Sequence, residues 1–210
     1  MSDEVVLYDY WRSSAAYRVR IALHLKGVAY RTVPIDLVAA EQSAPDYRTL
    51  NPQGLVPALS IGGHLLAQSL AIIEYLDATS PGPRLIPVNP LARAGVMAKA
   101  LIIIADIHPL NNLRVLHRLR SELNQDDAGV TRWYQHWILA GFAALELQAP
   151  AAGLFGGDQP DLVDLCLVPQ MTNARRFDTP LDGFPRLVRI DAALREHPAF
   201  VAAAPELAKK

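Results

Sequence analysis

The chain has 210 residues, of which 51% are hydrophobic and 20% are charged. This composition suits a globular protein with a sizeable core and excludes a disordered or fibrous chain. Twenty Lys and Arg side chains stand against 21 Asp and Glu, so the net charge of −1 favours neither nucleic acid nor a membrane as a partner. The single cysteine excludes a disulfide framework, a four-cysteine zinc site and a CxxC redox pair.

Targeting and membrane signals are not evident in the sequence. No apolar run reaches about 18 residues without a charge, which argues against a membrane span. The first four residues include Asp3 and Glu4 and lead straight into a short apolar stretch, unlike a secretory signal. We therefore expect a cytoplasmic protein.

The first eighty residues alternate strand and helix patterns. Short apolar runs predict strands at residues 5–8, 30–35 and 55–61, and Gly62-Gly63 predicts a hairpin that returns at 64–66. Ser13 and Ser14 precede an apolar helical pattern that ends at Gly27, and a further helix is expected over 69–78. The order βαβαββα is that of a thioredoxin-like domain.

A proline-rich segment at 81–90 marks a linker, because four prolines in ten residues fit neither a helix nor a central strand. The rest of the chain has helical patterns at 91–123, with a bend at Pro109, and at 131–147, 161–177 and 187–197. Asp161 is expected to cap the third of these helices, with Asp164 in its first turn. The predicted fold is therefore α/β plus all-α: a thioredoxin-like domain at 1–80, a linker at 81–90 and a helical bundle at 91–210.

Four sequence blocks, in the same order, resemble the zeta class of glutathione transferases. They cover residues 11–23, 51–57, 68–76 and 164–170, and the match extends over nearly the whole chain. The resemblance implies the glutathione transferase fold, reduced glutathione as cofactor with no metal, and a homodimer. It also implies glutathione-dependent cis–trans isomerisation of a maleyl-keto acid in aromatic-compound catabolism.

The chain departs from this resemblance at Ala15, where maleylacetoacetate isomerases usually carry cysteine. Cys166 lies in a predicted core helix and cannot replace it. The glutathione thiol must then itself be the nucleophile. The chain is more similar to the cysteine-free maleylpyruvate isomerases, also through residues 174–177. We therefore expect conversion of maleylpyruvate to fumarylpyruvate, with maleylacetoacetate as the next substrate.

Such an isomerisation needs temporary loss of the double bond, which a thiolate achieves by adding, allowing rotation and leaving. A free thiol is mostly protonated at about pH 7, so the site must favour its ionised form. A hydroxyl at a helix N-terminus does so. The pattern alone makes Ser13 and Ser14 helix caps. The resemblance implies that Ser13 is the catalytic thiol partner, with Ser14, Arg12 and the Ala15 backbone beside it.

The resemblance also implies contacts for the rest of glutathione. A cis peptide at Val56-Pro57 would expose backbone groups that pair with the cysteinyl part, and Gln68-Ser69 would hold the γ-glutamyl carboxylate. Without the resemblance, Pro57 fits a trans turn and Ser69 a plain helix cap. Further family contacts match at Gln42, His108 and Asn112. His108 equally fits a helix face, and Asn112 equally fits the bend at Pro109.

The expected substrate is a dianion whose carbonyl oxygen gains negative charge on addition, so positive donors beside it would lower the barrier. Arg12, Arg114 and Arg176 align with positions that bind acidic substrates in cysteine-free relatives, and Arg175 is the alternative to Arg176. The histidines show no metal-ligand spacing. Two other functions share the same features: a general glutathione transferase or haloacid dehalogenase, and a non-catalytic glutathione-binding protein.

Overall fold

The computed structural model describes residues 4–209 and divides into two compact units. One unit contains the described residues up to Arg84 together with those from Glu196 onward, and the other is Leu85–Arg195. The first unit is built on a mixed β-sheet and the second is helical. Among residues 4–209, no helix combines the length and the apolar character needed to cross a membrane.

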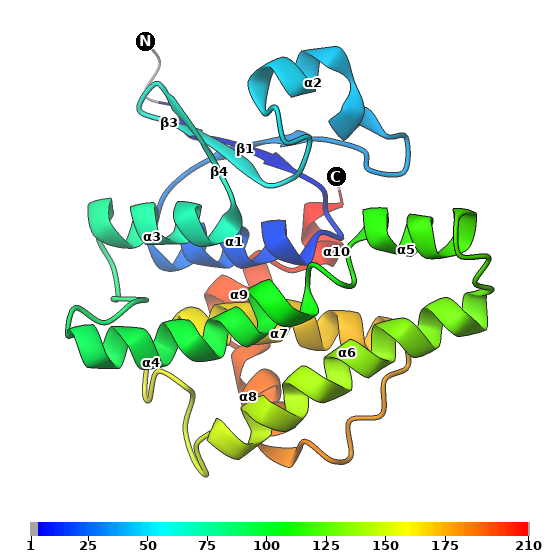
Figure 1. The fold of residues 1–210 in the computed structure, drawn as a ribbon. Coiled ribbons are helices and arrows are strands. Elements are labelled where there is room, and N and C mark those ends of the chain that lie inside the picture. Colours follow the sequence, from blue (N-terminus) through cyan, green and yellow to red (C-terminus); the bar gives the residue numbers. More distant parts are fainter. Residues whose placement is uncertain (1–3, 210) are drawn as a thin grey trace. The chain divides into compact units, whose positions relative to one another are not determined.

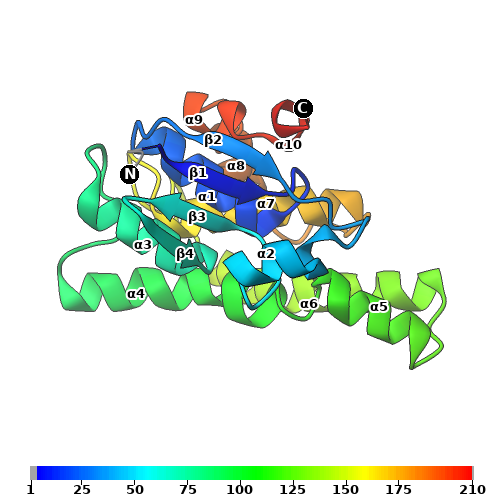
Figure 2. The ribbon, with the colours of Figure 1, turned by 90° about the horizontal axis from the view of Figure 1, so that it is seen from above.

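The sheet of the first unit has four strands in the order β2-β1-β3-β4 (Figure 2). They are β1 (Val6–Asp9), β2 (Arg31–Pro34), β3 (Ala58–Ile61) and β4 (His64–Ala67). Strands β1 and β2 are parallel, whereas β3 is antiparallel to both β1 and β4. Gly62 and Gly63 both have positive φ, as a tight β-hairpin turn requires. The predicted thioredoxin-like order of elements is confirmed.

Helices α1 (Ser14–Leu25) and α3 (Ser69–Thr79) pack against each other below the sheet in Figure 1, and α2 (Pro45–Leu50) lies away from them. A 3₁₀ turn, η1 (Glu41–Ser43), precedes α2. Ten consecutive residues of α1 are buried, and this helix packs against both α3 and α9 (Pro198–Ala202). Gly27, with φ of 62°, follows the end of α1 as predicted.

The topology of the sheet brings the loops that carry predicted site residues to one end of the sheet. Strand β4 runs in the same direction as β1, since β3 is antiparallel to both. The chain therefore leaves β1, β2 and β4 at the same end of the sheet and enters β3 there. In the register, Tyr8 lies opposite Val33 and Ala58, and Ala58 lies opposite Ala67. We call the segments just beyond this row the loop edge: residues 9–14, 35–44, 54–57 and 68–69.

The last described residues return to the first unit. Helix α9 and the short α10 (Pro205–Ala208) each begin with a proline, which suits the first helical position. The Tyr17 hydroxyl, on α1, donates to the Phe200 carbonyl at 3.4 Å. The sequence patterns did not predict these two helices in the alanine-rich tail.

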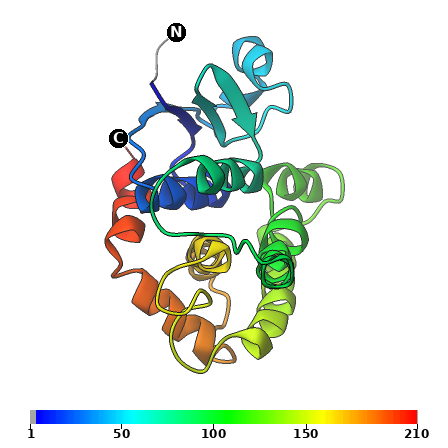
Figure 3. The same ribbon diagram turned by 90° about the vertical axis from the view of Figure 1, so that its left-hand side faces the viewer.

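The helical unit contains α4 (Pro90–Leu101), the π-helical turn η2 (Ile102–Ile107), α5 (Leu113–Ser121), α6 (Asp127–Gln148), α7 (Leu162–Arg176) and α8 (Pro185–Leu194). Figure 3 shows α7 end-on among its neighbours, and it packs against α4, α8 and η2. Asp161 accepts hydrogen bonds from Val163 and Asp164, and Asp164 accepts one back from Asp161, so the predicted cap is present as a capping box.

The helical segment expected over 91–123, with a bend at Pro109, is divided in the structure, since residues 108–112 separate η2 from α5. Pro109 has no N–H to continue the helical ladder. Asn112 then starts a new helix, because its side chain accepts a hydrogen bond from the Arg114 N–H at 3.2 Å. The chain thus breaks where a bend was expected.

Candidate functional site

Ser13 caps the N-terminus of α1. Its Oγ accepts a hydrogen bond from the Ala16 N–H at 3.2 Å, and its own N–H donates to the Tyr10 carbonyl at 2.8 Å. The hydroxyl hydrogen can therefore still be donated to another group. The first turn of α1 contains no acidic residue to oppose the positive end of the helix dipole. An anion placed at Ser13 Oγ would meet both a donor and a favourable field.

The neighbours of Ser13 differ from it in accessibility. Ser13 is half-buried, whereas Ser14 and Ala15 are each only 8% exposed and lie inside α1. Of the two serines, Ser13 is therefore the more accessible to a ligand.

Gln68 and Ser69 form the start of α3 at the same edge. Ser69 is buried, and Gln68 takes a left-handed conformation with φ of 70°. Gln68 Nε2 donates to Gln53 Oε1 at 2.7 Å, which joins the turn before β3 to the start of α3. Gln53 was not among the predicted site residues, and the structure joins it to one of them, Gln68.

The peptide bond between Val56 and Pro57 is cis, as the resemblance implied. The loop before it is held at Leu55, whose carbonyl accepts hydrogen bonds from Asn51 Nδ2 at 2.8 Å and from the Tyr47 hydroxyl at 2.7 Å. Burial raises the pKa of Tyr47, so this hydroxyl remains a donor throughout the neutral pH range. Two hydrogen bonds therefore fix the loop directly before Val56.

Gln42 carries a buried polar atom that lacks a partner among the described residues: its side-chain Oε1. A buried acceptor left unpaired costs free energy, so it is a natural contact for a ligand amide. The Gln42 backbone also packs closely on Gly54, since a Cβ built on Gly54 would lie 2.9 Å from the Gln42 carbonyl oxygen. Gly54 has φ of +63°, which side-chain-bearing residues rarely adopt.

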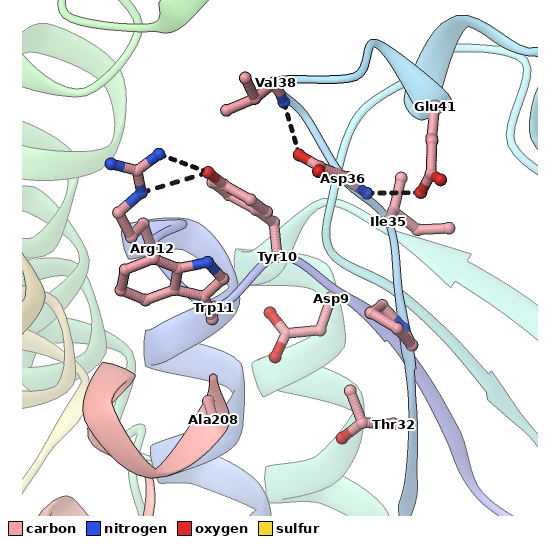
Figure 4. Close-up of a pocket in the computed structure, with 11 residues that line it drawn as sticks. Asp9, Tyr10, Trp11, Arg12, Thr32, Ile35, Asp36, Val38, Glu41 and Ala208 are labelled. Atoms are coloured by element: carbon pink, nitrogen blue, oxygen red, sulfur yellow. Dashed lines mark hydrogen bonds between the residues drawn. The ribbon is translucent and has the colours of Figure 1, made fainter. Parts of the chain in front are cut away.

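Arg12 lies at an open pocket of about 530 Å³ in the first unit (Figure 4). Its Nε and Nη2 donate to the Tyr10 hydroxyl at 3.1 and 2.7 Å, and its Cζ lies 4.9 Å from the centroid of the Trp11 ring. These contacts orient an exposed guanidinium beside the loop edge. Of the residues that line this pocket, Arg12 is the one that the sequence predicted as a site residue. Its other walls are Asp9, Tyr10, Trp11, Thr32, Pro34, Ile35, Asp36, Val38, Glu41 and Ala208.

The remaining candidates belong to the helical unit. His108 is half-buried at the end of η2, and its N–H donates to the Ile103 carbonyl at 2.9 Å. The Asn112 side-chain oxygen is used in capping α5, although its amide N–H groups can still donate. The Arg114 side chain is exposed on the first turn of α5.

Arg175 and Arg176 have different surroundings at the end of α7. Arg175 donates to Asp191, whose side chain is fully buried, so its charge is already paired. The Arg176 guanidinium lies 5.0 Å from the Phe177 ring, and Phe177 stacks on Tyr134 with ring centroids 3.6 Å apart. Burial raises the pKa of Tyr134, and the positive charge of Arg176 partly opposes this rise. Both arginines are exposed, but Arg175 is paired with a carboxylate, whereas Arg176 lies beside an aromatic ring.

The structure places one group of predicted residues in the first unit and a second group in the helical unit. Residues 12–14, 42, 56–57 and 68–69 lie at the loop edge of the first unit, and Ala15 follows inside α1, whereas His108, Asn112, Arg114 and Arg176 lie in the helical unit. Within residues 4–209, His, Cys, Asp and Glu side chains form no group of three that could hold a metal ion.

Comparison with known proteins identifies the family. Residues 3–78 match the model of the glutathione S-transferase N-terminal domain. The chain is 50% identical to a maleylacetoacetate isomerase of Rhizobium meliloti, over the whole length of both proteins. It is also similar to a solved maleylpyruvate isomerase described as a bacterial zeta-class glutathione S-transferase, with 44% identity, a TM-score of 0.93 and coverage of 96% and 97% of the two chains.

A further solved relative is a maleylacetoacetate isomerase of Methylobacterium extorquens AM1 with bound malonate and glutathione. It is 36% identical, with a TM-score of 0.92 and coverage of 96% of this chain and 97% of that one. The similarity extends over both units of the chain. The protein therefore belongs to the zeta class of the glutathione transferase family.

Proposed function

We propose that this protein is a glutathione-dependent cis–trans isomerase of maleyl-keto acids, with maleylpyruvate as its first substrate. The observation that carries the proposal is Ser13 at the N-terminus of α1, with Ala15 beside it and the single cysteine, Cys166, buried elsewhere. The loop edge thus offers a place that stabilises a thiolate while the chain has no accessible thiol of its own.

The residues at the loop edge fit glutathione chemically. Gln42 offers a buried amide oxygen that has no partner within residues 4–209. Ser13 caps a helix of 12 residues and Ser69 begins one of 11, and the N-terminal amides of both helices favour anions. When bound, glutathione supplies a thiolate that adds reversibly to the conjugated double bond, so that the bond can rotate. Ser69 and Gln68 would hold the γ-glutamyl end, and Val56 would pair with the peptide backbone.

Ser13 would control the charge of the sulfur. Its hydroxyl hydrogen would donate to the sulfur while its Oγ keeps accepting from the Ala16 N–H. This arrangement favours the ionised over the protonated thiol, because the donor and the helix dipole both stabilise negative charge. Ser14, being buried inside α1, would support the turn.

The arginines would bind and orient the substrate. Arg12, fixed on Tyr10 and Trp11, would meet a carboxylate or the carbonyl oxygen that gains charge. Arg176 and Arg114 are exposed, and no ion pair joins either to a carboxylate within residues 4–209. The malonate bound with glutathione in the Methylobacterium relative supports a dicarboxylate as the ligand class.

Maleylacetoacetate is the second candidate substrate, because the relative with 50% identity bears that name. We further propose that residues 1–80 bind glutathione and that 91–210, joined through 81–90, supply the substrate contacts. His108 and Asn112 would contact glutathione from the helical unit. Family membership supports a homodimer, and the balanced composition supports a cytoplasmic location.

The test is a spectrophotometric assay of both maleyl-keto acids with substoichiometric glutathione. An isomerase converts many equivalents of acid while the glutathione concentration stays constant, whereas a transferase or dehalogenase consumes one glutathione per turnover. Binding of glutathione without turnover of either acid would support the non-catalytic alternative. The absence of isomerisation of both acids refutes the proposed function.

A further inference from the structure

Arg20 lies under the loop that carries Ser13, and the mechanism above does not use it. Its side chain, on α1, is 2% exposed. Nη1 donates to both carboxylate oxygens of Asp9 at 2.8 and 2.7 Å, Nη2 donates to the Trp11 carbonyl at 3.1 Å, and Nε donates to the Ala203 carbonyl at 2.9 Å. One buried guanidinium therefore joins three separate segments of the first unit.

The first two contacts determine where Ser13 lies. Asp9 is the last residue of β1, and Trp11 is in the middle of the short loop between β1 and α1. The Ser13 N–H donates to the Tyr10 carbonyl at 2.8 Å, so the loop closes directly onto the helix cap. Because Arg20 holds the loop at Asp9 and at Trp11, little conformational freedom remains for Ser13 Oγ two residues later.

The third contact brings in the C-terminal segment. Beyond Ala203, Lys209 Nζ lies 5.0 Å from the centroid of the Trp11 ring, and Ala208 lines the same pocket as Trp11 and Arg12 (Figure 4). Arg20 thus holds both the loop, at Trp11, and the C-terminal segment, at Ala203. Lys209 of the same segment in turn contacts Trp11.

We propose that Arg20 is a positioning residue that holds the Trp11–Ser13 loop and the C-terminal segment, residues 196–209, in the one arrangement suited to glutathione. The inference rests on the proposed function in one respect: the atom that it positions, Ser13 Oγ, is the thiol partner. The role requires the planar fork of arginine, since a lysine ammonium cannot meet three acceptors of this geometry at once.

The test compares Arg20→Lys with Lys26→Met. Arg20→Lys keeps a positive charge beside Asp9 but loses carbonyl contacts. Lys26 forms a second buried ion pair in the same unit, with Asp77 at 2.8 Å, but it follows the opposite end of α1. Lys26→Met therefore costs at least as much stability without touching the loop, and it serves as the matched control.

For Arg20→Lys we expect about tenfold weaker glutathione binding in calorimetry, which corresponds to one lost charged hydrogen bond. The pKa of the bound thiol, followed by thiolate absorbance against pH, should rise by about one unit. Amide hydrogen exchange without glutathione should become faster at residues 11–17 and 196–209. Lys26→Met should lower the unfolding midpoint and leave all three quantities as in the wild type.

Two results overturn the inference: unchanged affinity, thiol pKa and exchange in Arg20→Lys, or equal changes in Lys26→Met, which would mean a general loss of stability. Failure of the proposed function is distinguishable, because the wild-type protein would then isomerise neither maleyl-keto acid. The exchange rates at residues 11–17 still decide, in that case, whether Arg20 holds the loop.

Discussion

Replacing Ser13 with alanine separates the two roles that the structure supports for this residue. The change removes the side-chain acceptor for the Ala16 N–H, a contact of 3.2 Å. Loss of a serine N-cap costs about 1 kcal/mol of stability, so the variant should fold with a slightly lower free energy of unfolding. This part of the effect would occur whatever the protein binds.

The second part depends on glutathione. A hydrogen bond to a charged group contributes about 1.5–3 kcal/mol, and each 1.36 kcal/mol corresponds to one pKa unit. The thiol of bound glutathione should therefore have a pKa about one to two units higher in Ser13→Ala than in the wild type. Turnover at neutral pH should fall by roughly ten- to a hundredfold, because less of the thiol is ionised.

Asn89→Ala is the matched control. Asn89 caps α4, and its side chain accepts hydrogen bonds from the Leu91 and Ala92 N–H groups, both at 3.0 Å. It should lose a similar amount of stability in urea unfolding, with thiol pKa and turnover unchanged. The reasoning is refuted if Ser13→Ala leaves the thiol pKa at its wild-type value, or if Asn89→Ala raises it as much.

Three further features can be tested by substitution. Arg176→Ala should raise KM for the keto acid about tenfold or more, with the free energy of unfolding nearly unchanged. Arg175→Ala should leave KM unchanged and lower the free energy of unfolding by about 2 kcal/mol, because it unpairs the buried Asp191. The opposite pattern in steady-state kinetics and urea unfolding would contradict the assignment. Burial, with the neighbouring Asp161 charge, raises the pKa of Asp164 to about 7. Asp164 thus contributes stability that is fully present below about pH 4 and lost as the pH rises through about 7. Asp164→Asn should flatten this decline in unfolding free energy, and an unchanged slope would count against the shift. Gly54→Ala should lower the free energy of unfolding by more than about 1 kcal/mol and weaken glutathione binding in calorimetry, because its Cβ would meet the Gln42 carbonyl. Gly27 also has a positive φ but faces open space, so Gly27→Ala should keep the wild-type affinity for glutathione. Equal affinities in the two variants would argue against the Gln42 contact.

Much of the loop edge could be predicted from the sequence because its signals are local. The Ser13 cap, the turn at Gly54 and the Ser69 helix start each depend on residues within one turn of chain. Once the strand order is known, the parallel and antiparallel directions bring these points to one end of the sheet. The cis bond at Pro57 was implied by family resemblance and by nothing in the local pattern.

The features that could not be predicted from the sequence depend on packing between residues that lie far apart along the chain. The π-helical turn η2 faces Gly141 on α6, where a Cβ would lie 2.3 Å from Ile107 Cδ1, so two helices approach more closely than any local pattern reveals. The difference between Arg175 and Arg176 depends on Asp191, sixteen positions away from the former. Arg20 lies within an apolar helical stretch, and its partner Ala203 is 183 positions along the chain.

The burial of the lone cysteine has a practical consequence for stoichiometry. Cys166 is 1% exposed in α7, so a thiol reagent added to the native protein would react slowly with the chain itself. Rapidly titrated sulfhydryl groups in a desalted, glutathione-loaded sample would therefore count ligand and not protein. Denaturing the same sample then adds one equivalent per polypeptide, which provides an internal standard for site occupancy.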